Sequence, residues 1–339
     1  MKVAIITFHN TPNNCGAVLQ AYALQRTLEK MGHEAKIIDY YRELGDMKPW
    51  WSFSSVRGIY YTMKYMLWEN IRLGKCRRFR RRHLNLTPAE YGGRVKYRDA
   101  EAYITGSDQV FNPIHNEGNP DFFLDFVPEG KKRIAYGASF GTDVFDEDYK
   151  QMLKNSLPRF DALSVREEKG SETIKSLSCI SAQIVADPTL LLDADEYRPL
   201  MADAEVNIPA SPYIFMYLIG NHPDARRLAV AKARELGVKR IFLMMNGRAE
   251  WHLPQLGIVR RLYVFTPADF LTLISNATYV VTNSFHGTAF STIFHRQFVS
   301  LKNGTAGDER MITLIDTLRS LGLEKYRASS IEFLKRALS

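Results

Sequence analysis

Cysteine is scarce in this sequence. Its 339 residues include three, Cys15, Cys76 and Cys179, which stand far apart and form neither a redox pair nor a zinc-ligand spacing. Such cysteine usage favours a reducing compartment. We therefore expect a cytoplasmic protein without structural zinc.

Long apolar runs are missing as well. No run approaches the roughly 18 residues that a membrane-spanning helix needs. The opening residues 1–8 turn polar at His9, which predicts a first strand and not a signal peptide. With 45% hydrophobic and 24% charged residues the composition is that of a globular protein, and the length fits two domains.

Glycine is nearly absent from the loop after the first strand. Residues 10–17 (NTPNNCGA) hold one glycine, Gly16, so the loop is neither a dinucleotide fingerprint nor a phosphate loop, and a nicotinamide cofactor is disfavoured. Free N–H groups at the start of the next helix can still hold an anion, with Asn14 and Cys15 lining the pocket. The alternative is an ordinary turn in which Gly16 eases helix packing.

Acidic residues are missing from one strongly basic segment. Residues 72–82 contain seven arginines and lysines and no acid, within a net charge of +8. Apolar residues upstream recur at helical spacing, which predicts a helix over 55–82. This helix either packs its apolar stripe on its own domain or rests on an anionic membrane face. No recognition module accompanies the charge, so we expect no binding of nucleic acid.

Short apolar runs alternate with helical patterns, as in α/β proteins with parallel sheets. The sequence predicts a Rossmann-like domain over 1–192, a linker over 193–212, a second such domain over 213–304 and a helical tail over 305–339 that crosses the interface or returns to the first domain. We expect strands at 3–8, 35–39, 102–105, 133–138, 162–165, 183–186, 213–218, 240–244, 262–265, 279–282 and 298–301. We expect helices at 17–31, 55–82, 147–157, 167–177, 224–236 and 268–276, one after residue 286, and one at 308–321.

Polar side chains follow the predicted strand 102–105. Ligands of parallel sheets bind outside the carboxyl ends of the strands. The residues there that could hydrogen-bond a sugar are Ser107, Asp108, Gln109 and Asn112, and Asp108 could receive the proton of a hydroxyl. The alternative is that Ser107 and Asp108 only cap the next turn.

Arg166 stands where the strand 162–165 gives way to a helix. Positive charge is unfavourable at a helix N-terminus, so a bound anion would explain it, and a guanidinium suits carboxylate or phosphate. The alternative is an ion pair with Glu167, Glu168 or Asp187.

His286 stands at the corresponding turn after the strand 279–282. Gly287 permits close backbone approach there, and Asn283 and Ser284 precede the histidine. An imidazole in this place can donate to phosphate or carboxylate and carry a proton near neutral pH. The alternative is a ring that fills the turn and bonds a carbonyl.

Four segments, taken together and in this order, resemble the polysaccharide pyruvyl transferase family. They are residues 13–24 (NNCGAVLQAYAL), 106–113 (GSDQVFNP), 164–168 (SVREE) and 283–290 (NSFHGTAF), and the resemblance runs from residue 1 to about residue 320. It implies two Rossmann-like domains of the glycosyltransferase-B type, with the active site in the interdomain cleft, the acceptor on the first domain and the donor on the second.

The resemblance also implies an activity. Family members move pyruvate from phosphoenolpyruvate onto hydroxyls of a sugar in a surface polysaccharide or its precursor, form a ketal and release phosphate, without metal or organic cofactor. The family's arginine corresponds to Arg166, which would hold phosphate or carboxylate, and its histidine to His286, which would carry a charge and give a proton. Asp108 is our choice for the base.

One position departs from the family pattern. Members often carry an arginine two residues before the histidine, where this chain has Ser284. We expect Arg310 or Lys302 to neutralise the second anionic group instead.

Two other functions stay open. One is a nucleotide-sugar-dependent glycosyltransferase of the same architecture, and the other is a non-catalytic relative that binds an anion. The acceptor sugar also stays open, although the basic segment 72–82 favours a lipid-linked sugar at the inner membrane face.

Overall fold

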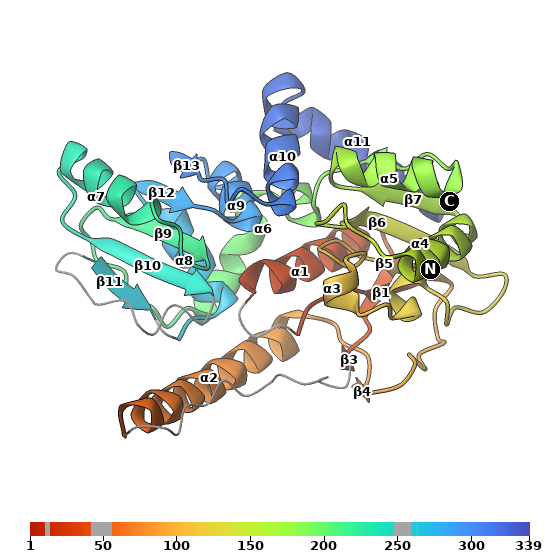
Figure 1. Cartoon of the computed structure of the whole chain (residues 1–339), viewed down its shortest axis with the longest axis horizontal. Coiled ribbons are helices and arrows are strands. Elements are labelled where there is room, and N and C mark those ends of the chain that lie inside the picture. Colours follow the sequence, from red (N-terminus) through yellow and green to blue (C-terminus); the bar gives the residue numbers. More distant parts are fainter. Residues whose placement is uncertain (11–13, 42–55, 247–258, 263) are drawn as a thin grey trace.

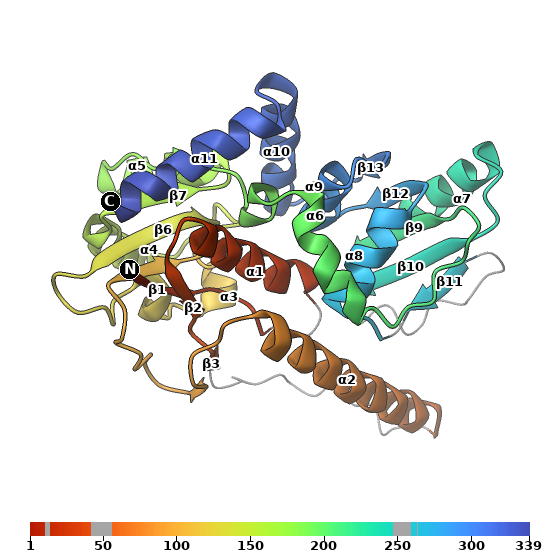
Figure 2. The same cartoon turned by 180° about the vertical axis from the view of Figure 1, so that it is seen from behind.

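The computed structural model describes residues 1–10, 14–41, 56–246, 259–262 and 264–339 (Figure 1). Strands and helices alternate and build two parallel sheets, each flanked by helices (Figures 1 and 2). No helix within the described ranges is long and apolar enough to cross a bilayer.

The first sheet has the strand order β2-β1-β5-β6-β7-β8, and all its pairs are parallel. The strand order changes direction between β1 and β5, and we call this place the reversal point of the sheet. Parallel α/β sheets bind ligands at such a point. The strands are β1 (Lys2–Ile6), β2 (Glu34–Ile37), β5 (Ala102–Thr105), β6 (Lys132–Ala138), β7 (Ala162–Val165) and β8 (Gln183–Ile184). Its helices are α1 (Cys15–Lys30), α2 (Val56–His83), α3 (Pro113–Asn116), α4 (Glu147–Ser156) and α5 (Glu168–Ser178), and β3 (Tyr40–Tyr41) pairs with β4 (Glu90–Tyr91) beside the sheet.

The second sheet has the order β11-β10-β9-β12-β13, again all parallel, and reverses between β9 and β12. Its elements are β9 (Ile214–Ile219), α7 (Ala225–Glu235), β10 (Ile241–Asn246), β11 (Val259–Leu262), α8 (Pro267–Asn276), β12 (Tyr279–Thr282), α9 (Phe285–Ile293) and β13 (Phe298–Ser300).

The strand predicted at 262–265 lies three residues earlier in the structure. The strand β11 ends at Leu262, and residue 263 lies outside the described residues. The side chain of Thr266 accepts a hydrogen bond from the N–H of Asp269, while Asp269 accepts from the N–H of Thr266. This capping box starts α8, so the chain has already left the sheet at Phe265.

The segment between the sheets, predicted as a linker over 193–212, contains short helices. It contains α6 (Ala194–Tyr197) and a 3₁₀ helix (Arg198–Asp203) that packs on α8, and the side chains of Tyr197 and Leu200 are buried. The burial of Tyr197 and Leu200 holds these short helices in place. The prediction of a linker relied instead on the prolines and acidic residues of the segment.

The C-terminal tail forms two helices, α10 (Glu309–Ser320) and α11 (Leu323–Leu338), separated by Gly322 with φ 79°. Only glycine adopts this backbone conformation without strain. α10 lies against α9 and α5, and α11 returns to the first domain, where the hydroxyl of Tyr326 donates to the carbonyl of Val185 (2.8 Å).

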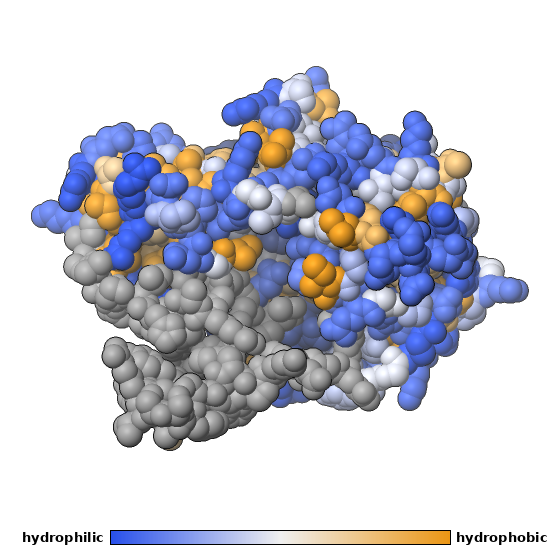
Figure 3. All heavy atoms as spheres, in the orientation of Figure 1, coloured by the Kyte–Doolittle hydropathy of each residue, from blue (hydrophilic) through white to orange (hydrophobic). Residues whose placement is uncertain are grey.

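One hydrophobic cluster continues from the first domain into the second. It includes Leu24 of α1, Phe215 of β9 and Phe290 of α9, and the rings of Tyr197 and Phe290 meet edge to face at 5.0 Å. A continuous apolar interface of this kind restrains relative domain motion. The described residues on the outer face in Figure 3 are mostly hydrophilic, with apolar residues in small separate groups.

Candidate active site between the two domains

The ligand-binding edges of the two sheets meet at the domain interface. Asn14 at the start of α1 and Asp108 after β5 come from the first reversal point, and His286 on α9 comes from the second. A Cβ atom added to Gly16 would lie 2.1 Å from Nδ1 of His286, so the imidazole rests directly on the backbone of α1. This contact is possible only at glycine.

A second contact joins the domains beside the first. Cζ of Arg166, at the end of β7, lies 4.7 Å from the centroid of the Phe285 ring on α9. A guanidinium over an aromatic face is attracted by the electron-rich face of the neutral ring. The cation of one domain and the aromatic ring of the other thus fix the place of the neighbouring His286.

Arg166 is paired with two buried carboxylates. Its two terminal nitrogens donate to Asp187 Oδ2 (2.5 Å) and Asp108 Oδ1 (3.1 Å), and its side chain is 1% exposed. Ser107 donates to the same Oδ2 of Asp187 (2.8 Å). A buried guanidinium requires such partners because an unpaired charge in the interior is strongly unfavourable. We call Ser107, Asp108, Arg166 and Asp187 the ion-pair cluster.

The predicted anion-binding role of Arg166 therefore needs correction. The alternative, an ion pair with Asp187, is what the structure contains, and Asp108 is a second partner that the sequence argument did not consider. Both terminal nitrogens of Arg166 donate to carboxylates, so Arg166 positions Asp108 and Asp187, while its buried Nε atom makes no hydrogen bond to the described residues.

Asp108 is held in an unusual conformation. Its φ is 75°, in the left-handed region that costs most side chains about 1 kcal/mol or more and is often found at functional sites. Its second oxygen accepts from Nδ2 of Asn14 (3.4 Å). Burial raises the pKa of Asp108, but the neighbouring positive groups, Arg166 first among them, outweigh burial and lower the pKa overall. A carboxylate with low pKa and occupied oxygens is a poor base, which weakens the role predicted for it.

His286 lies at the edge of the ion-pair cluster. Its Nε2 atom is 4.0 Å from Asp187 Oδ2 and makes no hydrogen bond within the described part of the chain, although it is buried. Burial lowers the pKa of His286, and the attraction of Asp187 and Asp108 does not restore it. Burial thus favours the neutral imidazole, whereas the predicted charged form relies on the anions of a bound substrate.

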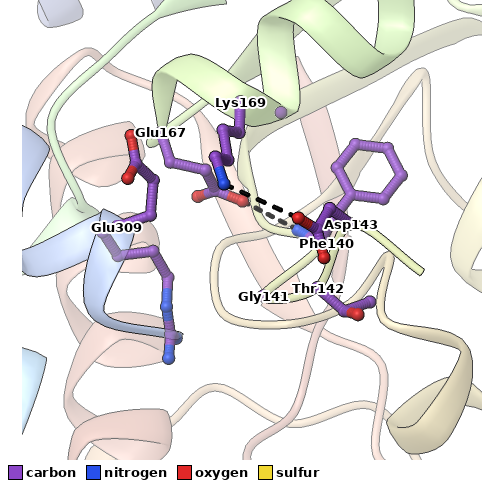
Figure 4. Close-up of a pocket in the computed structure, with 9 residues that line it drawn as sticks. Phe140, Gly141, Thr142, Asp143, Glu167, Lys169 and Glu309 are labelled. Carbon is purple, nitrogen blue, oxygen red and sulfur yellow. Dashed lines mark hydrogen bonds and ion pairs between the residues drawn. The ribbon is translucent and has the colours of Figure 1, made fainter. Parts of the chain in front are cut away.

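A hollow near the ion-pair cluster is lined by several ionisable groups, among them Glu167 and Arg310. It is lined by the loop after β6, the start of α5 and the start of α10, and Figure 4 shows Glu167 and Glu309 approaching it from the two helices. Glu167 Oε1 accepts from the N–H of Phe140 (2.8 Å), while Oε2 is buried and makes no hydrogen bond to the described residues. Burial raises the pKa of Glu167 more than Arg166 and Arg310 lower it.

Arg310 lines the same hollow from α10. Its Nε atom donates to the carbonyl of Gly307 (3.3 Å), and its side chain is not fully enclosed. Burial, followed by repulsion from Arg166, lowers the pKa of Arg310 to about 10. The positive charge of Arg310 is thus incompletely compensated by its neighbours. A bound anion would stabilise the charged guanidinium. Lys302, the other residue considered for this role, is exposed on the second domain.

Three predicted binding residues on the second domain have structural roles. The side chain of Asn283 bridges the N–H and carbonyl of Ile219 at the end of β9 (2.7 and 2.9 Å). Ser284, in the place of the family arginine, caps α9 by accepting from the N–H of Gly287 (3.4 Å). A Cβ atom at Gly287 would lie 2.2 Å from Thr282 Oγ1, so this glycine lets α9 pack on β12.

Three predicted residues on the first domain also lie outside the ion-pair cluster. Cys15 is packed in the hydrophobic core, where burial raises the pKa of its thiol. Asn112 donates to Gln109 Oε1 (2.7 Å) and caps α3, whereas the predicted capping alternative named Ser107 and Asp108. Asn14, Ser107, Asp108, Arg166, His286 and Arg310 are the predicted residues that the structure brings together.

Glu167 and Asp187 entered the prediction as possible partners of Arg166. Glu167 stands two residues after β7 and Asp187 three residues after β8, and these positions near strand ends were the available sign of a role in the site. From the sequence alone, an acidic residue that belongs to a site at a strand-to-helix turn cannot be distinguished from one that caps the helix, because both occupy the same positions.

Comparison with known proteins agrees with this architecture. A family model for polysaccharide pyruvyl transferase matches residues 14–305, and no match was found among curated proteins. A crystal structure of UDP-GlcNAc 2-epimerase from Neisseria meningitidis bound to UDP-GlcNAc is 10% identical, with 100% of this chain and 99% of that chain covered and a TM-score of 0.51. A putative UDP-N-acetylglucosamine 2-epimerase from Listeria monocytogenes is 12% identical, with 98% and 88% covered and a TM-score of 0.49.

At such identities the likeness to the Neisseria structure concerns the fold, two Rossmann-like domains of the glycosyltransferase-B type. The family match spans most of both domains and includes all four residues of the ion-pair cluster and the turn that carries His286. The chain therefore belongs to the polysaccharide pyruvyl transferase family.

Proposed function

We propose that this protein transfers the pyruvyl group of phosphoenolpyruvate to two hydroxyls of a sugar in a surface polysaccharide or its precursor, forming a ketal and releasing phosphate. The observation that carries the proposal is the hollow beside the ion-pair cluster, where an incompletely compensated Arg310 and a carboxyl group with a free oxygen lie together. Membership of the family supports the pyruvyl transfer itself.

Arg310 is the anion holder in this proposal. A substrate carboxylate or phosphate would supply the negative charge that its surroundings lack, and a guanidinium binds either group with two parallel hydrogen bonds. Arg166 acts through Asp108 and Asp187, whose positions it fixes. No metal ion or organic cofactor enters the proposed reaction.

The first chemical step joins a sugar hydroxyl to the central carbon of phosphoenolpyruvate. Glu167, whose pKa is raised by burial, gives its proton to the methylene carbon, and the double-bond electrons form the new C–H bond. The central carbon then accepts an oxygen of the sugar, whose proton passes to the neutral imidazole of His286.

The second step closes the ketal. The bond to the phosphate oxygen breaks with its electron pair, and His286 returns its proton to the departing phosphate. The second sugar hydroxyl attacks the same carbon and gives its proton to Glu167. Both residues thereby regain their starting protonation, one proton ends on the methyl group and the other on phosphate.

Mass spectrometry tests the activity. The purified protein is incubated with phosphoenolpyruvate and a set of free, nucleotide-linked and lipid-linked hexoses, and each acceptor is examined for a pyruvyl adduct. We expect an adduct and phosphate release that require both substrates. Glycosyl transfer from UDP-GlcNAc with no reaction of phosphoenolpyruvate would favour a glycosyltransferase, and anion binding without turnover would favour a non-catalytic relative.

A further inference from the structure

The helix α2 carries the basic segment, and the structure divides that segment between two faces. Figures 1 and 2 both show α2 on the opposite side of the molecule from α10. Its buried face holds Cys76 and Phe79, and Arg72 lies over the ring of Phe265 at 5.5 Å. Arg82 donates to Asp203 (2.5 Å) on the segment between the sheets. Through these contacts, α2 of the first domain packs on residues of the second domain and of the segment between the sheets.

The opposite face of α2 is exposed and has two parts. Met63, Leu67 and Ile71 recur at a spacing of four residues and are 65%, 59% and 38% exposed, so they form one apolar row at helical spacing. Arg77, Arg78 and Arg81 continue that row toward the end of the helix. All three arginines are exposed and make no ion pair with the described residues.

The arrangement differs from an ordinary solvated helix. Three large apolar side chains on one exposed row are unfavourable in water, while Arg72, Arg80 and Arg82 show that this helix makes internal partners for its basic residues where it packs. Anionic membranes offer both missing partners, since lipid headgroups attract arginine and the acyl boundary accepts apolar side chains. Long basic side chains reach the headgroups while the helix lies in the interface.

We infer that the outer face of α2, made of Met63, Leu67, Ile71, Arg77, Arg78 and Arg81, docks the protein on an anionic membrane surface. The apolar row enters the headgroup boundary, and the three arginines bind the negative headgroups. This docking is independent of the reaction proposed above.

Vesicle flotation tests the inference with the full chain. We expect binding to phosphatidylcholine vesicles that contain phosphatidylglycerol, much weaker binding to pure phosphatidylcholine, and a decrease as salt screens the charges. The triple variant Arg77→Gln/Arg78→Gln/Arg81→Gln should bind about 100-fold more weakly, because each basic residue near an anionic surface contributes about fivefold. Leu67→Asp should also lose binding, since a carboxylate cannot enter the boundary.

The matched control carries the same change of charge elsewhere. Arg234, Lys239 and Arg240 are exposed on the second domain near the end of α7, and their triple change to glutamine should leave vesicle binding within about twofold of wild type. All substituted residues are exposed, and unchanged melting temperatures verify the fold. Absence of binding to the anionic vesicles, an equal loss in the control, an unaffected Leu67→Asp variant, or binding to duplex DNA with the vesicles left unbound would each overturn the inference.

Discussion

The absence of one side chain at position 16 allows the two domains to meet at the site. His286 occupies the place of a Cβ atom there, and a methyl group at 2.1 Å from its Nδ1 would force the ring or α9 to move. We expect Gly16→Ala to reduce turnover by at least about 100-fold, because displacements of about 1 Å at a catalytic group have that effect. Overpacking should also lower the free energy of unfolding by about 1–3 kcal/mol, measured in urea.

Gly74→Ala is the control for this substitution. Gly74 lies in the interior of α2 with nothing within 4 Å of an added Cβ atom. Alanine should raise helix stability slightly and leave turnover unchanged. If Gly16→Ala retained full activity, the close seating of His286 on α1 would be of no importance for the reaction.

Glu167 should show opposite effects on stability and on activity. Its pKa is raised by burial, so the unfolded chain ionises more readily than the folded one. Its carboxyl therefore costs no stability below the unfolded pKa of about 4.3 and increasingly destabilises the fold as pH rises through that value toward the folded pKa. We expect Glu167→Gln to melt at a higher temperature than wild type near pH 7 and at an equal temperature near pH 4, while turnover falls by at least about 100-fold.

Glu168→Gln provides the comparison, because Glu168 is the adjacent, exposed residue of the same type on α5. Neither its melting temperature nor its turnover should change appreciably with the substitution. Activity in Glu167→Gln that equals wild type, with an unaltered pH profile, would remove Glu167 from the proton transfers.

At the scale of residues, sequence patterns located the site better than they assigned roles within it. His286, Arg166 and Asp108 were predicted from their positions at strand ends, and the structure brings them together. Their charge states were not predictable, because burial decides the pKa of His286 and the pairing of Arg166, and burial depends on the packing of both domains.

At the scale of elements, α11 fixes the segment that carries Asp187. Arg327 on this helix donates to the carbonyls of Leu190 (2.8 Å) and Leu192 (3.2 Å), which follow Asp187 in the chain. Arg327→Gln should leave these carbonyls unsatisfied and lower the free energy of unfolding by about 2–3 kcal/mol, measured by denaturant titration. Arg336→Gln on the exposed face of α11 should change it by less than about 0.5 kcal/mol.

The prediction of elements succeeded where periodicity is strong. The strands of both sheets are short apolar runs, and most of their positions follow from the sequence to within a few residues. Helix α11 was predicted only as part of a helical tail, because the predicted helix ended at Leu321 and the break at Gly322 left no expectation for the next segment. The short helices between the sheets were missed since helices of four to six residues have no clear period.

At the scale of the molecule, the reversal points of the two sheets meet at the domain interface. This interface has an apolar core and a charged edge. The shared hydrophobic cluster holds the domains in place, and the ion-pair cluster lies at its edge with His286 from the other domain. The strand order of each sheet was not fixed by the sequence pattern alone, and the meeting of the two reversal points results from it. An anion that contacts both Arg310 on α10 and His286 on α9 would link these two helices.

Phosphoenolpyruvate should therefore raise the melting temperature of the whole protein. A ligand present at about 100 times its dissociation constant adds about 2.7 kcal/mol to the stability of the folded state. In Arg310→Gln the same shift should need about 10-fold to 100-fold more ligand, because hydrogen bonds to a charged group contribute about 1.5–3 kcal/mol. Lys302→Gln, at the exposed alternative position, should respond like wild type. The reverse result, with Lys302→Gln insensitive to the ligand and Arg310→Gln unaffected, would move the anion site from the hollow to the outer edge of the second sheet.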